Sequence, residues 1–255
     1  MQERQLLLTV RFRGTRYHGY QVQPNGVTVA QVIQDAVERV FESRLDIKGC
    51  SRTDAGVHAN GFCLSLHTVS GIPCDAVVRA MNVNLPDDVA VTGCREVPLG
   101  FHPRYDCAGK RYLYQIYNGP VKNPFLTDLA LFHKYPLDEH LMDAAARSFL
   151  GTHDFLAFCS AGSKIEDTVR TVTAASVTRK GEMVTFSVTG DGFLYNMVRI
   201  MAGTLLDAAR GIFAPSDISR MIEGRDRSAA GATAPAHGLY LDEVFYGEIG
   251  SSKIT

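Results

Sequence analysis

The chain has 255 residues, of which 45% are hydrophobic and 21% charged, and this composition excludes intrinsic disorder and fibrous architectures. At roughly 150 residues per domain, the length predicts one large domain or two small ones. The formal net charge of -1 excludes a basic excess over the whole molecule, so a polyanionic partner has to bind a local patch of positive charge.

The N-terminal part of the chain predicts strands separated by helices. Residues 6–12 alternate as a strand does. Thr28 followed by Gln31 is a capping-box pattern, and the apolar residues after it recur at helical spacing as far as Phe41. Strand patterns follow at 46–50 and 61–67, then a short helix at 75–83 and a strand at 89–97.

A second set of elements follows the loop 98–104. We predict a strand at 111–117, a helix at 138–150 closed by Gly151, strands at 170–178 and 183–190, a helix at 193–210 stopped by Gly211, a helix at 216–223 and a strand at 239–246. Strands in pairs with helices between them favour an α+β fold with antiparallel sheet. The loop divides the chain into predicted lobes at 1–104 and 105–255.

The cysteines and histidines show no pattern of a metal site. The six cysteines contain no CxxC pair, which favours buried thiols in a reducing compartment. The eight histidines lack HxxxH and HExxH spacings, so we expect no bound metal. No run of about 18 apolar residues occurs, and the charged N-terminus is unlike a signal peptide, so we expect a cytoplasmic protein without a membrane partner.

Two short segments are locally basic. In the first twenty residues four arginines oppose only Glu3, and between His102 and Arg111 three basic residues, Arg104 among them, oppose only Asp106. These segments could meet to form a patch for a polyanion. Short charge clusters are also common on ordinary solvated faces.

The segment CSRTDAGVHA, residues 50–59, concentrates chemically active side chains. It follows a predicted strand and holds an arginine, a hydroxyl, the Asp54 carboxylate and a histidine around one glycine. Asp54 has two interpretations, as a catalytic carboxylate or as a turn aspartate that bonds its own backbone. An aspartic protease is excluded, because the paired Asp-Thr/Ser-Gly loops of that chemistry are missing.

Arg199 lies in a predicted helix among apolar residues. An unpaired buried guanidinium costs several kcal/mol, so Arg199 should face a carboxylate or a phosphate unless it snorkels to the surface. Small residues at helical spacing, Ala202 and Gly203, would let another segment approach closely. Tyr112 and Tyr114 are predicted to point to the same face of a strand, where ordinary half-buried aromatics are common.

SRTDAGVHA closely resembles the GRTDAGVHA signature of the TruA-type tRNA pseudouridine synthases. The resemblance extends along the chain in order. FRGTRYHGYQVQPNGVTVAQVIQDAVERV is similar to the family's opening segment and first helix, MNVNLPDDVAV to its N-x-LP-x-D stretch, FHPRYDCAGKRYLYQIYN to its F-H-A-R block, and GDGFLYNMVRIMAGTLL and GLYL to its C-terminal motifs.

The resemblance implies the activity and the roles of the site residues. The reaction is conversion of uridine to pseudouridine in the anticodon arm, at the family-typical tRNA positions 38 to 40. Asp54 matches the nucleophile that attacks the flipped uridine, and Arg199 the arginine that pairs with it. Tyr112 matches the tyrosine suited to stack on the extruded uracil. Arg52 is implied to contact the displaced nucleotide or phosphates. Gly238–Leu241, with Leu239, either forms an apolar pocket wall or is simply the edge of the last strand.

The implied architecture is α+β, with two related lobes whose largely antiparallel sheets join into one, helices on one face and an active cleft between the lobes. The implied partners are tRNA and a second copy of the chain in a homodimer. No cofactor is expected, because exchanging a C–N for a C–C glycosidic bond is redox-neutral and needs no group donor.

Four positions depart from the family pattern. Ser51 replaces a glycine, Phe12 and Arg13 stand where Tyr-Asp is usual, and Tyr20 replaces a tryptophan. Because Asp54, Arg52, Tyr112 and Arg199 are all retained, the departures bear on the choice of RNA rather than on the reaction. Two rival functions remain: a catalytically silent RNA-binding or tRNA-folding protein, and a carboxylate-dependent hydrolase.

Overall fold

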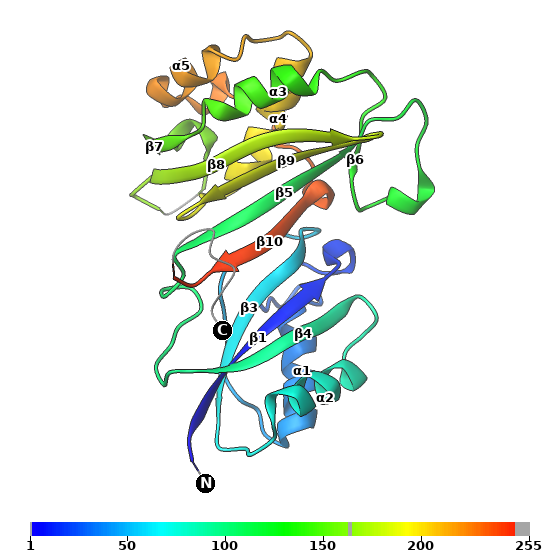
Figure 1. Cartoon of the computed structure of the whole chain (residues 1–255), viewed down its shortest axis with the longest axis vertical. Coiled ribbons are helices and arrows are strands. Elements are labelled where there is room, and N and C mark those ends of the chain that lie inside the picture. The colour runs from blue at the N-terminus through cyan, green and yellow to red at the C-terminus, as the bar shows by residue number, and fades with distance from the viewer. Residues whose placement is uncertain (1, 163–164, 248–255) are drawn as a thin grey trace. The chain divides into compact units, whose positions relative to one another are not determined.

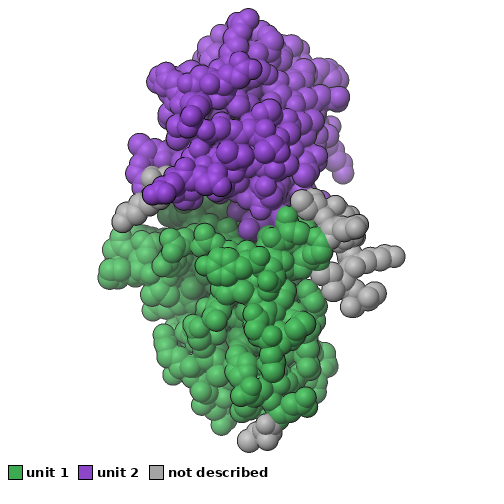
Figure 2. Space-filling view, turned by 90° about the vertical axis from the view of Figure 1, so that its left-hand side faces the viewer, with its two compact units in different colours: residues 1–108, 240–255 green, residues 109–239 purple. Residues whose placement is uncertain are grey.

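The chain folds into two units, residues 1–108 with the segment from Tyr240 onward, and residues 109–239 (Figures 1 and 2). The structure is a computed structural model that describes residues 2–162 and 165–247. The sequence predicted a single C-terminal lobe over 105–255. The last strand, β10 (Leu239–Phe245), instead pairs in parallel with β3 through Tyr240 and Leu241, and this pairing places residues 240–247 in unit 1.

Unit 1 is built on a largely antiparallel sheet in the order β4, β1, β3, β10, with β2 beside β3 (Figure 1). Its other strands are β1 (Arg4–Phe12), β2 (Ile47–Gly49), β3 (His58–Thr68) and β4 (Val89–Val97). The central strand β1 pairs antiparallel with both β3 and β4 and carries the fully buried Leu6 and Leu8. The four strands predicted in this part of the chain are therefore confirmed.

Two helices pack together beside the strands of unit 1, α1 (Val29–Phe41) and α2 (Cys74–Asn84) (Figure 1). The Thr28 hydroxyl accepts a hydrogen bond from the Gln31 N–H at 3.4 Å, which confirms the predicted start of α1. Ile33 and Val37 of α1 are fully buried, as the apolar stripe predicts.

Unit 2 is built on an antiparallel sheet in the order β5, β9, β8, β7, with the short strand β6 parallel to β5. The strands are β5 (Gly109–Tyr117), β6 (Leu131–Phe132), β7 (Gly151–Asp154), β8 (Val169–Lys180) and β9 (Met183–Gly190). Strands β5, β8 and β9 confirm the predictions. The sequence did not predict β6 and β7, which are too short to show a period.

Three helices accompany these strands, α3 (Glu139–Arg147), α4 (Met197–Ala209) and α5 (Asp217–Gly224). Two predicted helix ends were wrong. Helix α3 ends at Arg147 rather than 150, and Gly151, at φ 106°, opens β7 instead of capping the helix. Helix α4 begins at Met197 rather than 193, because Asn196 has a left-handed backbone, at φ 60°, that interrupts the helical path.

Short 3-10 turns connect the longer elements: Gly14–Arg16, Pro124–Leu126, Leu156–Phe158, Arg227–Ala229 and Ala236–Gly238. The prediction of an α+β fold with largely antiparallel sheet is confirmed by both units. Over the described ranges, no helix combines the length and apolar character needed to cross a membrane.

Candidate active site

The loop that carries Asp54 connects two paired strands of unit 1. Strand β2 runs antiparallel to β3, and the Cys50 N–H donates to the Cys63 carbonyl at 2.9 Å, so the base of the loop is closed. Within the loop Arg52 is exposed and Asp54 is partly exposed. The Val57 N–H donates to the Asp54 carbonyl at 3.2 Å and forms a turn. The paired strands thus fix both ends of the loop that carries the Asp54 carboxylate and the Arg52 guanidinium.

The segment 14–20, which precedes the loop in the chain, packs against it. The Tyr20 N–H donates to the Thr53 carbonyl at 3.1 Å. A Cβ atom on Gly19, at φ 80°, would lie 2.5 Å from that carbonyl oxygen, and one on Gly14 would lie 1.9 Å from the Val57 oxygen. Glycine is therefore required at both positions for the close approach that fixes the path of the Asp54 loop.

His58, the histidine of the motif, is buried at the start of β3 with 1% of its surface exposed. Its Nδ1 accepts a hydrogen bond from the Gly14 N–H at 2.9 Å, and its ring stacks on Tyr240 with centroids 4.6 Å apart. These contacts tie the start of β3 to the segment 14–20 and to β10, so His58 packs in the support of the loop.

Arg199 lies on α4 in unit 2, half-buried. Its Nε donates to the Ala234 carbonyl at 2.8 Å, and its Nη1 donates to the Asn196 side-chain oxygen at 2.8 Å. The guanidinium is thus held at fixed points rather than extended into solvent, so the snorkelling interpretation does not describe it. Arginine suits such a site because its planar group offers five donors in fixed directions.

The small residues of α4 admit another backbone segment, as the sequence predicted. A Cβ atom on Gly203 would lie 1.8 Å from the Ala232 carbonyl oxygen. The Thr204 hydroxyl accepts from the Gly231 N–H at 3.0 Å. The segment 231–234 therefore rests directly on α4, and its Ala234 carbonyl reaches Arg199.

Replacing Gly203 by alanine is expected to destabilise the protein by about 1–3 kcal/mol, because the added methyl overlaps a backbone oxygen that is itself packed on the helix. A matched control is Gly224→Ala at the end of α5, where nothing lies within 4 Å of the added Cβ. This substitution should be neutral or should stabilise the protein by about 0.4–1 kcal/mol. Thermal melts of both variants test this. Equal melting temperatures would contradict the close packing.

Tyr112 and Tyr114 point to the same buried face of β5, as predicted. Tyr112 is 7% exposed and meets the Phe193 ring edge-to-face, with centroids 5.1 Å apart. Tyr114 is fully buried, and its hydroxyl donates to the Pro235 carbonyl at 2.8 Å. Burial raises the pKa of Tyr114, so this hydroxyl stays protonated and remains a donor. Tyr114 is thereby a structural residue.

Leu239 opens β10 and is 7% exposed. The residue before it, Gly238, fits against the Tyr114 ring, from which a Cβ atom would be only 2.7 Å away. Arg199 and Tyr114 both bond the segment 234–235 that leads into this turn. Among the predicted site residues, the structure thus brings Arg52 and Asp54 together in unit 1, while unit 2 carries Tyr112, Arg199 and Leu239.

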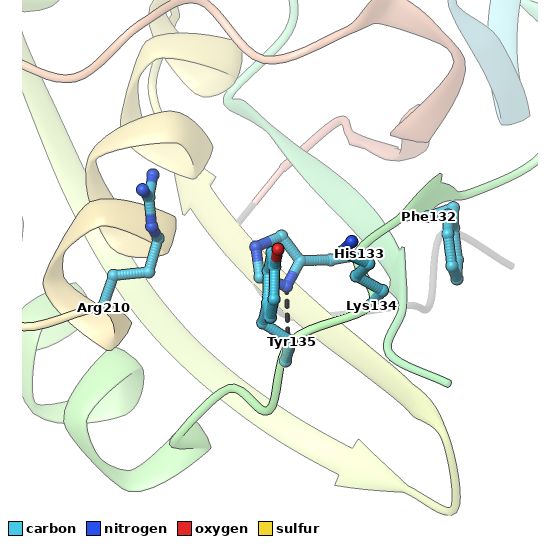
Figure 3. A pocket seen from close by; sticks show the side chains of 5 residues that line it. All are labelled: Phe132, His133, Lys134, Tyr135 and Arg210. Carbon is cyan, nitrogen blue, oxygen red and sulfur yellow. Dashed lines mark hydrogen bonds between the residues drawn. The ribbon is translucent and has the colours of Figure 1, made fainter. Parts of the chain in front are cut away.

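Each unit also has a concave region. In unit 2, a depression of about 390 Å³ lies between Arg210, at the end of α4, and the segment after β6, where the His133 Nδ1 is 2.9 Å from the Tyr135 carbonyl oxygen (Figure 3). None of the predicted site residues lines it. In unit 1, a cavity of about 220 Å³ is lined by Arg52 and by Lys48 and Tyr105, which the sequence did not single out.

The predicted basic patch of the first twenty residues is partly neutralised. Arg4 pairs with Glu96 at 2.6 Å and also donates to two backbone carbonyls. Arg16 pairs with Asp88 at 3.3 Å. Arg104, from the second basic segment, instead lines the cavity beside Arg52. Arg11 and Arg13 of the N-terminal segment remain exposed, so positive charge available to a polyanion lies both along that segment and at this cavity.

Comparison with known proteins identifies the family. Residues 8–106 and 145–247 match the family described as tRNA pseudouridine synthase. The chain is 44% identical over 245 residues to a tRNA pseudouridine synthase A from Exiguobacterium sibiricum, covering 96% of this chain and 98% of that one. It is 45% identical to the protein of that name from Acetivibrio thermocellus (95% and 100% covered) and 43% identical to the one from Ruminiclostridium cellulolyticum (95% and 100%). The chain belongs to the tRNA pseudouridine synthase family.

Three of the departures from the family pattern, Phe12, Tyr20 and Ser51, lie around the Asp54 loop. Tyr20 and Ser51 line the unit 1 cavity. The Tyr20 ring packs on Phe62 with centroids 4.3 Å apart, and its buried hydroxyl has no hydrogen-bond partner within the described residues. Phe12 is 4% exposed and also contacts the Phe62 ring. These replacements therefore alter the support and the wall of the loop and leave Asp54 and Arg52 in place.

Proposed function

We propose that this tRNA pseudouridine synthase modifies uridines in the anticodon arm, at positions 38 to 40, with Asp54 as the nucleophile. The observation that carries the proposal is the Asp54 loop, whose sequence is nearly identical to the family signature. The loop connects the paired strands β2 and β3, and the backbone of Gly14 and Gly19 packs closely against it. A carboxylate on a rigid, partly exposed loop can reach a nucleotide that has left its helix.

Each proposed site residue then has a task in the isomerisation. Asp54 attacks the flipped uridine and forms a transient bond to it, the bond from C1′ to N1 of uracil breaks, and the base turns. C1′ then bonds to C5, C5 gives up a proton, N1 gains one, and the bond to Asp54 breaks, so that the carboxylate is free again. We propose that Arg199 pairs with the Asp54 carboxylate during the reaction, as the family resemblance implies. Tyr112 stacks on the extruded uracil, Leu239 contributes apolar wall, and Arg52 contacts the displaced nucleotide or its phosphates.

The direct test is pseudouridine mapping of unmodified tRNA incubated with and without the purified protein. We expect new pseudouridine at 38, 39 or 40 of the tRNA and at no position outside the anticodon arm. Modification confined to another arm would leave the family activity standing and contradict the proposed target. Absence of any new pseudouridine would favour the silent RNA-binding rival.

We also propose a homodimer in which both subunits grip one tRNA, as the family resemblance implies. A dimer would offer tRNA two local basic patches, which would strengthen the electrostatic attraction that a single chain with a net charge of -1 provides. Light scattering during size-exclusion chromatography should then give twice the mass of the chain. The mass of a single chain at micromolar concentration would contradict this proposal.

Removing metals or keeping thiols reduced is expected to leave the rate of pseudouridine formation unchanged. The isomerisation is redox-neutral, and the six cysteines are all free thiols. The protein is treated with EDTA, freed of it by gel filtration and assayed with separately folded tRNA, so that the RNA keeps its own magnesium. A parallel assay adds dithiothreitol. Loss of activity that one specific metal restores would contradict the expectation.

A further inference from the structure

The cavity of unit 1 holds cations that the proposed reaction leaves unassigned. Lys48 projects from β2, and Arg104 comes from the segment before β5. Within the part of the chain that the structure describes, neither side chain makes an ion pair, and both residues are exposed. Arg4 and Arg16, by contrast, are neutralised by acidic partners. Unpaired cations gathered at a concave surface are suited to a phosphate group.

An exposed aromatic ring stands at the same cavity. Tyr105 is 77% exposed, and its ring lies against His102 with centroids 4.3 Å apart. The backbone of this turn is fixed, because the Tyr105 N–H donates to the His102 carbonyl at 3.1 Å and the Arg104 N–H donates to the His102 ring at 3.2 Å. The nearby Asp106 carboxylate accepts the His102 N–H and does not line the cavity.

The size of the cavity limits what can occupy it. About 220 Å³ is below the range of roughly 300–1,000 Å³ that is usual for sites of free small molecules. A cavity of this size, open to solvent and beside an exposed ring, suits one unit of a longer polymer. Arg52 belongs both to this cavity and to the Asp54 loop, so the polymer would also pass the proposed nucleophile.

We propose that this cavity is a subsite for a single-stranded nucleotide of the RNA substrate, close to the target uridine, where Lys48 and Arg104 bind phosphate and Tyr105 stacks on the base. The proposal rests on the proposed function for the identity of the substrate. It adds three contact residues that neither the signature motif nor the implied catalytic set contains.

The phosphate contacts are tested by the salt dependence of tRNA binding. Lys48→Gln and Arg104→Gln should each weaken binding and reduce the slope of log affinity against log salt by about 0.7, the change expected for one contact to single-stranded nucleic acid. Matched controls are Lys180→Gln and Arg39→Gln, which remove exposed cations of β8 and α1, respectively. An unchanged slope in both cavity variants would overturn the phosphate assignment.

The stacking contact is tested by Tyr105→Ala, which should weaken tRNA binding about 5-fold to 150-fold without changing the salt slope. Tyr105→Phe should bind like the wild type, because stacking needs only the ring. Tyr135→Ala is the control, since Tyr135 is likewise exposed and next to a histidine ring but lies at the unit 2 depression. Affinity unaffected by Tyr105→Ala would overturn the stacking role.

Further measurements separate the possible failures. Uridine monophosphate and inorganic phosphate should compete with tRNA only at millimolar concentrations; tight binding of either would mean a site for a free anion and overturn the RNA subsite. If the wild type forms pseudouridine while the cavity variants bind normally, the subsite fails and the function stands. If the cavity variants lose affinity for tRNA but the wild type forms no pseudouridine, the proposed function is contradicted and the RNA subsite stands.

Discussion

Replacing Asp54 by asparagine is expected to abolish pseudouridine formation while leaving the fold and tRNA affinity close to wild type. The amide fills the same volume on the same loop, and the backbone contacts of Gly14, Gly19 and Tyr20 that hold the loop do not involve the carboxylate. An amide oxygen cannot serve as the nucleophile in this isomerisation. Single-turnover assays with tRNA in excess over Kd, together with thermal melts, measure the two expectations separately.

Asp35→Asn provides a matched control, because it makes the same change of charge at an exposed position of α1. It should retain the wild-type rate. Turnover by Asp54→Asn near the wild-type rate would remove Asp54 from the mechanism. Cleaved RNA or released base as the product of the wild type would instead favour the carboxylate-dependent hydrolase.

The sequence predicted the long elements well because their signals are local. Thr28 and Gln31 define the start of α1 by a hydrogen bond between neighbours in the chain, and the alternation in β4 and β9 follows from burial of one face. The predicted ends failed where tertiary contacts decide them. Gly151 is the first residue of β7 because it pairs with Val172, a partner 21 positions away that no local pattern reveals.

The proposed site residues, whose roles stay predictions, could be identified from the sequence, since Asp54, Arg52, Tyr112, Arg199 and Leu239 lie in motifs that resemble a known family. The physical environment of these residues could not. The guanidinium of Arg199 donates a hydrogen bond to the Ala234 carbonyl, and this contact depends on the packing of residues 231–234 against α4. Gly203 indicated that some segment could approach α4, but not which one.

The cationic cavity was outside the reach of sequence reasoning. Its walls come from β2, from the Asp54 loop and from the segment before β5, so its charges are scattered along the chain. Net charge in a window of sequence indicated the segment 102–111 with Arg104, but not Lys48, and it also indicated the N-terminal arginines. Two of these are paired with Glu96 and Asp88, acidic residues more than 70 positions away that the window does not include.

Replacing Tyr112 by alanine is expected to lower the single-turnover rate more than tRNA affinity. If the ring stacks on the extruded uracil, its loss destabilises the flipped state by roughly 1–3 kcal/mol, which is about 5-fold to 150-fold in the flipped population. Tyr112 is proposed to contact only the extruded uracil, whereas the rest of the tRNA keeps its contacts, so Kd should change less than the rate. Tyr112 is 7% exposed and packs on Phe193, so the same substitution also destabilises the fold by about 3–5 kcal/mol.

Two further variants separate stacking from stability and from proton transfer. Tyr112→Leu keeps most of the buried volume but loses the flat ring, so it should fold better than Tyr112→Ala and remain as slow. Tyr112→Phe keeps the ring, and we expect a rate close to wild type. If the hydroxyl moves a proton, Tyr112→Phe alone should lose roughly a hundredfold or more.

Tyr114→Phe is the control on the same face of β5, because it removes a hydroxyl that donates to the Pro235 carbonyl and has only a structural role. It should lower the melting temperature and leave the rate of the folded protein unchanged. All rates are compared at a temperature where each variant is fully folded. Should Tyr112→Ala and Tyr112→Leu both keep the wild-type single-turnover rate under that condition, Tyr112 contributes packing alone and the uracil must be held by other groups.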